Sequence, residues 1–165
     1  MTDEKTIGTI GTYTMKFSLS ATEAGEIYQL LCFTPGRIIV AEMGSFTPVG
    51  NWKVSDFFLG SRKWRLSKLN SPLRAEAREK AVTRAGQLGR LPVESMIESD
   101  KANFHIAFEE IVKVQMMRPN QIMGTAWLTI ITKTQKYQFG ILNKDDFDNQ
   151  SDLIRSVLND KLTIS

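Results

Sequence analysis

The chain has 165 residues, of which 42% are hydrophobic and 24% are charged, and its formal net charge is +3. This balance is typical of a globular protein with one core, and the single cysteine, Cys32, excludes an intramolecular disulfide. No apolar run approaches the roughly 20 residues that span a bilayer, and the first residues lack the features of a signal peptide, so we expect a cytoplasmic protein.

The first part of the chain predicts antiparallel strands. Residues 13–20 ("YTMKFSLS") alternate apolar and polar side chains with the period of two that is typical of a strand. Residues 26–33 and 37–43 are rich in β-branched and aromatic side chains, and the turn sequence "TPG" joins them. These two runs therefore predict a hairpin.

Residues 44–102, here called the helical segment, lack strand alternation. Ser71 followed by Pro72 is typical of a helix start, and Gly86 is typical of a helix end, so we expect a helix over 72–85. A second, short helix is expected to follow it.

Small side chains recur every four residues along the first of these helices and predict a narrow packing face: Leu73, Ala77, Ala81 and Ala85. The second helix is expected over 92–100. Because loop length alone costs little free energy, we expect the helical segment to be peripheral and its deletion to leave a folded β domain.

The last part of the chain predicts four more strands and a terminal helix. The strands are expected over 103–107, 111–118, 122–132 and 135–142. The helix is expected over 145–160, and its apolar residues fall on one stripe: Phe147, Leu153, Ile154, Val157 and Leu158. Seven antiparallel strands hide their edges in a closed or nearly closed arrangement, and a terminal helix can cover one open end of it.

Three phrases carry a resemblance to a known superfold: "TPGRIIVAEM" (34–43), "IAFEEIVKV" (106–114) and "LTIITKTQKYQFGI" (128–141). With the order of the predicted elements, they resemble the pleckstrin-homology-like (PH-like) superfold, especially its GRAM-type and bacterial PH-like members, over roughly 13–43 and 103–160. The resemblance implies an α+β, mainly antiparallel fold. It would be a single PH-like domain over 1–165, a seven-stranded bent barrel or sandwich with a C-terminal capping helix, and the helical segment would be an insertion after the third strand.

The residues that usually carry catalysis or bind metals do not form a recognisable set. His105 is the only histidine and lies on a predicted strand, and no Cys/His cluster is present for zinc. Glu109 and Glu110 are adjacent, so on a strand they point to opposite sides and cannot form an acid/base pair. We therefore expect no catalytic residue, no cofactor and no metal, and a non-enzymatic binding or scaffolding module.

Positive charge is concentrated in one part of the chain. Residues 60–90 contain nine Lys or Arg and two Glu, which is a net charge of +7, whereas the remainder carries −4. Within this part, "FFLGSRKWRLSKL" (57–69) mixes aromatic and basic side chains. The candidate contact residues for an anionic ligand or a membrane are Arg62, Lys63, Trp64, Arg65 and Lys68.

Several interpretations of this stretch stay open. The aromatic residues can anchor the helical segment to the barrel, with the cations as a solvated rim. Alternatively, the stretch can bind anionic lipid headgroups and give a peripheral membrane location, as PH-like relatives often bind lipid headgroups or peptides. A protein partner or a second copy of the chain can use a sheet edge or the helix over 72–85. Nucleic acid is less favoured, because no recognised binding motif is present.

Overall fold

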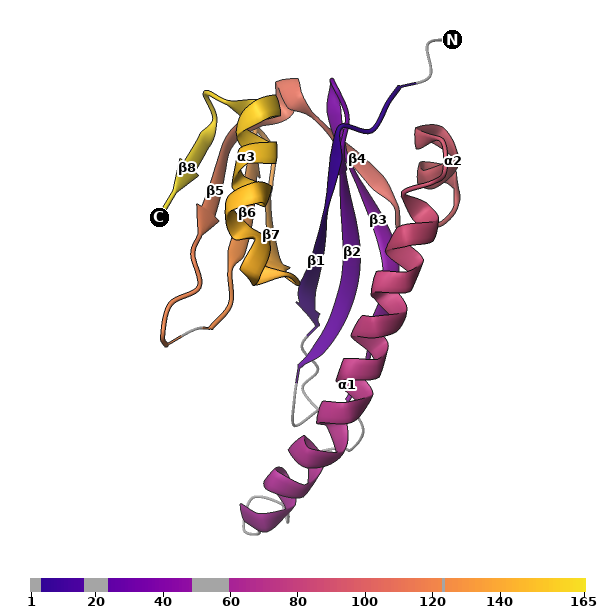
Figure 1. Ribbon diagram of the computed structural model, residues 1–165, viewed down its shortest axis with the longest axis vertical. Helices are drawn as coiled ribbons and strands as arrows, with labels where there is room; N and C mark the ends of the chain where they lie inside the picture. The colour runs from indigo at the N-terminus through magenta and orange to yellow at the C-terminus, as the bar shows by residue number, and fades with distance from the viewer. Residues whose placement is uncertain (1–3, 17–23, 49–59, 123) are drawn as a thin grey trace.

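The computed structural model describes residues 4–16, 24–48, 60–122 and 124–165, and within these it describes no side chains for residues 60–69. The fold is α+β and mostly antiparallel (Figure 1). The strands are β1 (Gly8–Lys16), β2 (Gly25–Phe33), β3 (Arg37–Phe46), β4 (Phe104–Ala107), β5 (Ile111–Met117), β6 (Trp127–Thr132), β7 (Lys136–Ile141) and β8 (Leu162–Ile164). The helices are α1 (Gly60–Leu88), α2 (Val93–Glu98) and α3 (Phe147–Leu158), with short 3₁₀ turns η2 (Phe108–Glu110) and η3 (Lys144–Asp146).

The described strands form one open eight-stranded sheet in the order β4-β3-β2-β1-β7-β6-β5-β8. All neighbours are antiparallel except β5 and β8, which are parallel. The expectation of seven strands missed β8, which follows α3 and pairs Leu162 with Val114. A strand of three residues is too short to show a period in the sequence, so only its tertiary pairing reveals it.

Two halves of the sheet, β1–β4 and β5–β8, meet at a short seam between β1 and β7. The seam pairs Thr12 with Ile141 and Tyr13 with Gly140, and the Leu142 amide also donates to the Gly11 carbonyl at 3.0 Å. A Cβ atom on residue 140 would lie 2.3 Å from Cζ of Tyr13. Glycine is therefore required where the Tyr13 ring lies against β7.

The inner core lies between the two halves of the sheet and α3. It contains one face of β1–β3, the apolar faces of β5–β7 and the apolar stripe of the terminal helix. Phe147, Ile154 and Leu158 are buried, and Leu153 and Val157 pack against the same cluster. The predicted stripe of this helix is therefore confirmed.

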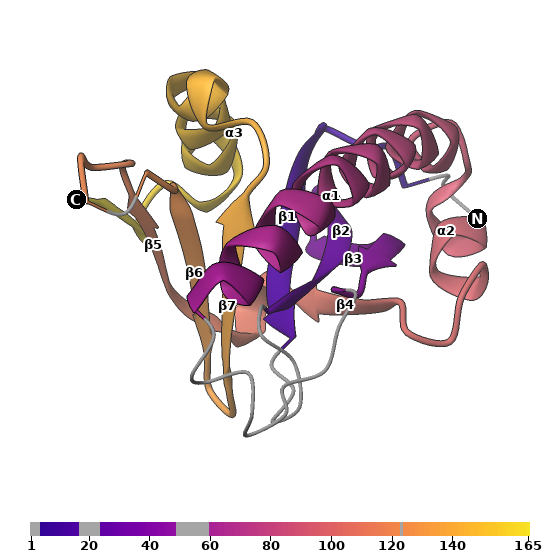
Figure 2. The same ribbon diagram turned by 90° about the horizontal axis from the view of Figure 1, so that it is seen from below.

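The outer core lies on the opposite face of β2 and β3, where α1 and α2 cover the sheet (Figure 2). Its strand residues include Tyr28, Leu30, Cys32, Ile39, Ala41, Met43 and Phe46, and its helix residues include Ala81, Leu88, Val93 and Met96. A strand segment that is buried on both faces carries consecutive apolar side chains, as residues 30–33 of β2 and 38–41 of β3 do.

The helical segment supplies one wall of the outer core, a role that the expectation of a peripheral segment did not include. Ala81 is buried and Ala77 and Ala85 are partly buried, so the predicted small-residue face packs on the sheet of its own chain. Leu73, the fourth predicted member of that face, is 38% exposed.

The bounds of α1 also correct the sequence prediction. The helix begins at Gly60 and passes through Pro72, which lies inside the helix rather than at its first position. A proline there removes one backbone hydrogen bond. Packing on both sides offsets that loss, because Asn70 is fully buried and Arg74 contacts Glu26. The helix also continues past Gly86, to Leu88.

Two predicted strands are shorter or displaced. β1 covers residues 8–16 instead of 13–20, and residues 17–20 lie outside the described residues. β6 begins at Trp127 rather than at residue 122, because a turn precedes it in which Gly124 has a φ of +59°. A left-handed glycine favours a turn over a continuous strand.

Candidate functional site

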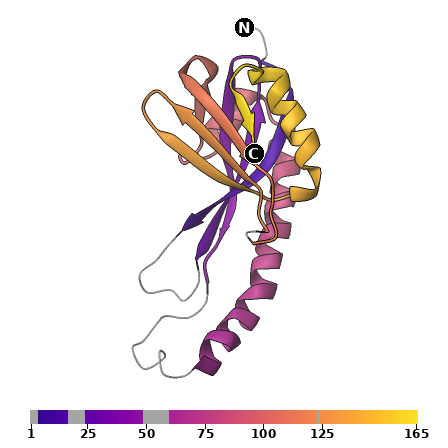
Figure 3. The same ribbon diagram turned by 90° about the vertical axis from the view of Figure 1, so that its left-hand side faces the viewer.

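The predicted contact residues Arg62, Lys63, Trp64, Arg65 and Lys68 all belong to the first part of α1. Their side chains lie outside the described part of the chain, as do Phe57 and Phe58 entirely. The backbone of this part of α1 continues past the described ends of β2 and β3 (Figures 1 and 3). The structure thus brings the five positions together on one helical segment and places that segment at one end of the molecule.

A buried carboxylate holds the later part of α1 on the sheet. The side chain of Glu26, in β2, is 5% exposed and receives two hydrogen bonds from Arg78 of α1. The Arg78 Nη2 and Nε atoms lie 2.7 and 3.1 Å from the two carboxylate oxygens. Arg74, one helical turn earlier, has its Nε 3.6 Å from Glu26 Oε1, and the Tyr28 hydroxyl donates to Oε2 at 2.6 Å.

Aromatic rings complete the environment of the two arginines. The Arg78 guanidinium lies 5.3 Å from the Tyr13 ring centroid, and that of Arg74 lies 4.8 Å from the Phe46 centroid. Burial, together with the Glu26 carboxylate, raises the pKa of Tyr28, so its hydroxyl stays protonated and can donate. The hydrogen bonds to Glu26 raise the pKa of Arg78 above its usual value. This group fixes α1 relative to the sheet.

Sequence reasoning missed this arrangement. Its signal was an acidic residue at the start of an apolar strand, with two arginines four residues apart on the predicted helix. The members are separated by 52 residues between Glu26 and Arg78, so the sequence alone does not pair them.

Glu26→Gln should lower the free energy of unfolding by about 2–3 kcal/mol. Removing one partner of a buried ion pair costs about 3–5 kcal/mol, and the partial exposure of both arginines reduces that cost. The control is Glu76→Gln, which breaks the exposed Glu76–Lys80 pair and should leave stability nearly unchanged. Urea denaturation measures both, and equal effects would show that Glu26 does not anchor α1.

A second ion-pair cluster ties α2 and the N-terminal residues to β3. Arg37 Nη2 lies 2.6 Å from Glu4 Oε2, and Arg37 also pairs with Glu94 of α2. Burial acts to raise the pKa of Glu4, but hydrogen bonds from Thr34 and Arg37 outweigh it and leave that pKa lowered. These contacts join the N-terminal residues, β3 and α2 to one another, so we interpret the cluster as structural.

A cleft of about 240 Å³ lies where α1 meets the start of η3. Arg78 and Tyr13 line it on the side of α1 and β1. The remaining lining residues come from the turn before β6 and from the link between β7 and η3: Gly124, Thr125, Ile141, Leu142, Asn143, Lys144 and Asp145. The cleft therefore lies between the contacts of Glu26 with Arg78 and Arg74, here called the α1 anchor, and the half of the sheet that contains β7.

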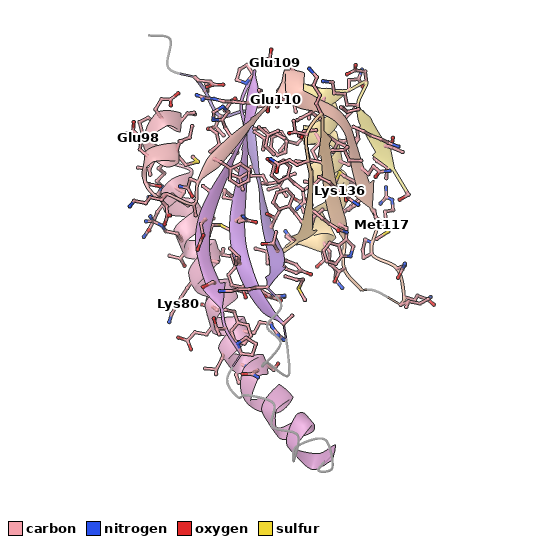
Figure 4. The ribbon with its side chains drawn as sticks, turned by 180° about the vertical axis from the view of Figure 1, so that it is seen from behind. Lys80, Glu98, Glu109, Glu110, Met117 and Lys136 are labelled. Carbon is pink, nitrogen blue, oxygen red and sulfur yellow. The ribbon has the colours of Figure 1, made fainter. Side chains whose placement is uncertain are left out.

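The other residues considered in the sequence analysis do not form a common site in the described structure. His105 is exposed on β4, and Glu109 and Glu110 are exposed on η2, where β4 meets β5 (Figure 4). Burial raises the pKa of the Cys32 thiol. Among the described residues, no three His, Cys, Asp or Glu side chains are grouped as metal ligands would be. No helix in the described part of the chain is long and apolar enough to cross a membrane.

Comparison of the chain with protein-family models, with curated proteins and with solved structures finds no match.

Proposed function

We propose that the chain is a non-enzymatic, PH-like binding module that the first part of α1 recruits to an anionic membrane surface. The PH-like part of the proposal is supported by the strand order β4-β3-β2-β1-β7-β6-β5 and by α3, which packs into the inner core after the last strand of that series. The three sequence phrases named above fall on β3, on β4–β5 and on β6–β7.

The observation that carries the membrane proposal is the position of the basic end of α1. This end continues past the described ends of β2 and β3, and residues 60–74 contain five Lys or Arg and no acidic residue. Glu26 meanwhile holds the later part of the helix on the sheet. A cation near an anionic bilayer contributes about 1 kcal/mol, so four such residues can provide reversible binding. Tryptophan suits the headgroup region between water and lipid.

Changing Arg62, Lys63, Arg65 and Lys68 together to Gln should abolish binding to vesicles that contain phosphatidylserine. The assay is vesicle co-sedimentation at about 20 mM salt, where screening is weak. Stability should stay nearly unchanged, since solvated charges contribute little. The charge-matched control changes four exposed lysines, Lys5, Lys101, Lys133 and Lys136, to Gln and should retain most binding. Equal loss in both variants would leave net charge as the cause and contradict the proposal.

The Trp64→Ala variant tests whether the indole contacts the membrane or packs within the chain. We expect the variant to keep its melting temperature and to bind these vesicles more weakly. A large drop in melting temperature would instead assign the ring to packing within the chain, with the cations as a solvated rim.

The second candidate function is the binding of an extended peptide at β4. In the described sheet β4 is an edge strand that pairs only with β3, and an edge offers free backbone donors and acceptors. Wild-type protein that ignores phosphatidylserine vesicles even at low salt would favour this candidate.

A further inference from the structure

The cleft beside Arg78 has the donors of an anion site. Its walls come from α1, β1, β7 and η3, from the turn before β6 and from the link between β7 and η3. Three of these elements each supply a side-chain hydrogen-bond donor. These donors are the Arg78 guanidinium of α1, the Tyr13 hydroxyl of β1 and the Lys144 ammonium of η3. We propose that this cleft binds a phosphoryl group.

Each of the three side chains has an N–H or O–H group that can donate to a ligand. Glu26 engages Nε and Nη2 of Arg78, which leaves Nη1 outside that pairing. Lys144 donates to the Gly124 carbonyl at 3.1 Å, which uses one of its three N–H groups. Tyr13 is only 7% exposed and lines the cleft, so its hydroxyl can donate to an acceptor bound there.

The surroundings hold the donors in place before a ligand arrives. The Tyr13 ring lies against Gly140 and beside Trp127, with its centroid 6.2 Å from that of the indole. Arg78 is fixed by its two bonds to Glu26. Donors that are already ordered lose less conformational entropy on binding, so a small ligand can be held by few contacts.

The size and the donors of the cleft indicate the ligand class. The cleft has a volume of about 240 Å³. That is below the roughly 300–1,000 Å³ of sites for drug-sized ligands and suits one small headgroup. The charged lining residues are Arg78, Lys144 and Asp145, and Glu26 pairs with Arg78 from outside the cleft, so the preference for an anion rests on the free donors rather than on net charge. Three donors from separate elements match the three free oxygens of a phosphoryl group better than the two of a carboxylate.

The test is an NMR titration of the full-length ¹⁵N-labelled protein with inorganic phosphate and with glycerol 3-phosphate at constant ionic strength. We expect saturable shifts of the Gly124, Thr125 and Lys144 amides. Acetate and chloride should produce much smaller ones. No saturable shift at these amides would overturn the proposal, and acetate that binds as tightly as phosphate would overturn the phosphoryl assignment.

Two substitutions probe the donors without removing the α1 anchor. Lys144→Gln and Tyr13→Phe should each weaken phosphate binding about fivefold, which corresponds to the loss of roughly one exposed ion pair or one hydrogen bond. Tyr13→Phe keeps the ring against Gly140 and Arg78 and should leave the melting temperature nearly unchanged. Asp145→Asn removes a like charge and should tighten binding.

The matched control is Lys136→Gln, an exposed lysine of β7 that does not line the cleft (Figure 4). If this variant weakens binding as much as Lys144→Gln, the attraction is general and the cleft is not a site.

The proposal is independent of the basic end of α1. The variant in which Arg62, Lys63, Arg65 and Lys68 are changed to Gln should therefore still bind soluble phosphate. Vesicles that contain phosphatidic acid, whose phosphate is a monoester, identify the source of the group: Lys144→Gln should weaken vesicle binding if the ligand is a lipid headgroup and leave it unchanged if the ligand is soluble.

Discussion

Deleting residues 48–102 and joining β3 to β4 with a short flexible linker should leave a chain that does not fold. The deletion removes the helices that cover β2 and β3 and exposes the strand side of the outer core: Tyr28, Leu30, Cys32, Ile39, Ala41, Met43 and Phe46. Burial of one large apolar side chain contributes about 1.5–3 kcal/mol. The combined loss is comparable with the whole stability of a typical domain, about 5–15 kcal/mol.

Circular dichroism and thermal melting test this expectation. Cooperative melting with a clear strand signal in the deletion protein would show that the helical segment is dispensable after all. Two single substitutions in α1 test the contribution of its packing without shortening the chain. Leu88→Ala, at a fully buried position, should cost about 2–5 kcal/mol, whereas Val82→Ala, at a position 63% exposed, should cost little.

Ile154→Ala should lower the free energy of unfolding by about 2–5 kcal/mol. Ile154 is fully buried in the inner core, where α3 packs against both halves of the sheet. Its neighbour Arg155 is exposed and pairs with Asp152, also exposed, at 2.9 Å. Arg155→Ala should therefore change stability by less than about 1 kcal/mol.

Chemical denaturation compares the two variants under one set of conditions. The wild-type slope of unfolding free energy with denaturant should be retained in both, so the midpoints report stability directly. Equally small effects would show that α3 is not docked through its apolar stripe.

The sequence predicted best those elements whose apolar residues are also their buried residues. The strands of the first hairpin and the stripe of the terminal helix are examples, because local pattern and tertiary packing agree there. The start of α1 was predicted wrongly because Pro72 is a local signal that packing around Asn70 and Arg74 overrides. β8 is too short to carry a pattern.

The candidate sites also differ in how much of each can be recognised from the sequence. The basic stretch of α1 is continuous in sequence, so composition alone revealed it. The cleft joins Tyr13, Arg78, Thr125 and Lys144, which lie far apart along the chain, and only the folded sheet brings them together. The Glu26 anchor likewise depends on a contact across 52 positions of sequence.

The seam between β1 and β7 joins the two halves of the sheet through few backbone bonds, whereas β1 and β2 pair along their full lengths. The inner core is a second connection, since one apolar cluster contains residues of both halves. Arg78 is bound to the first half through Glu26, and Lys144 follows β7 of the second half. A bound anion that contacts both cations would therefore add a third connection across the seam, and it should slow hydrogen exchange at the Leu142 amide.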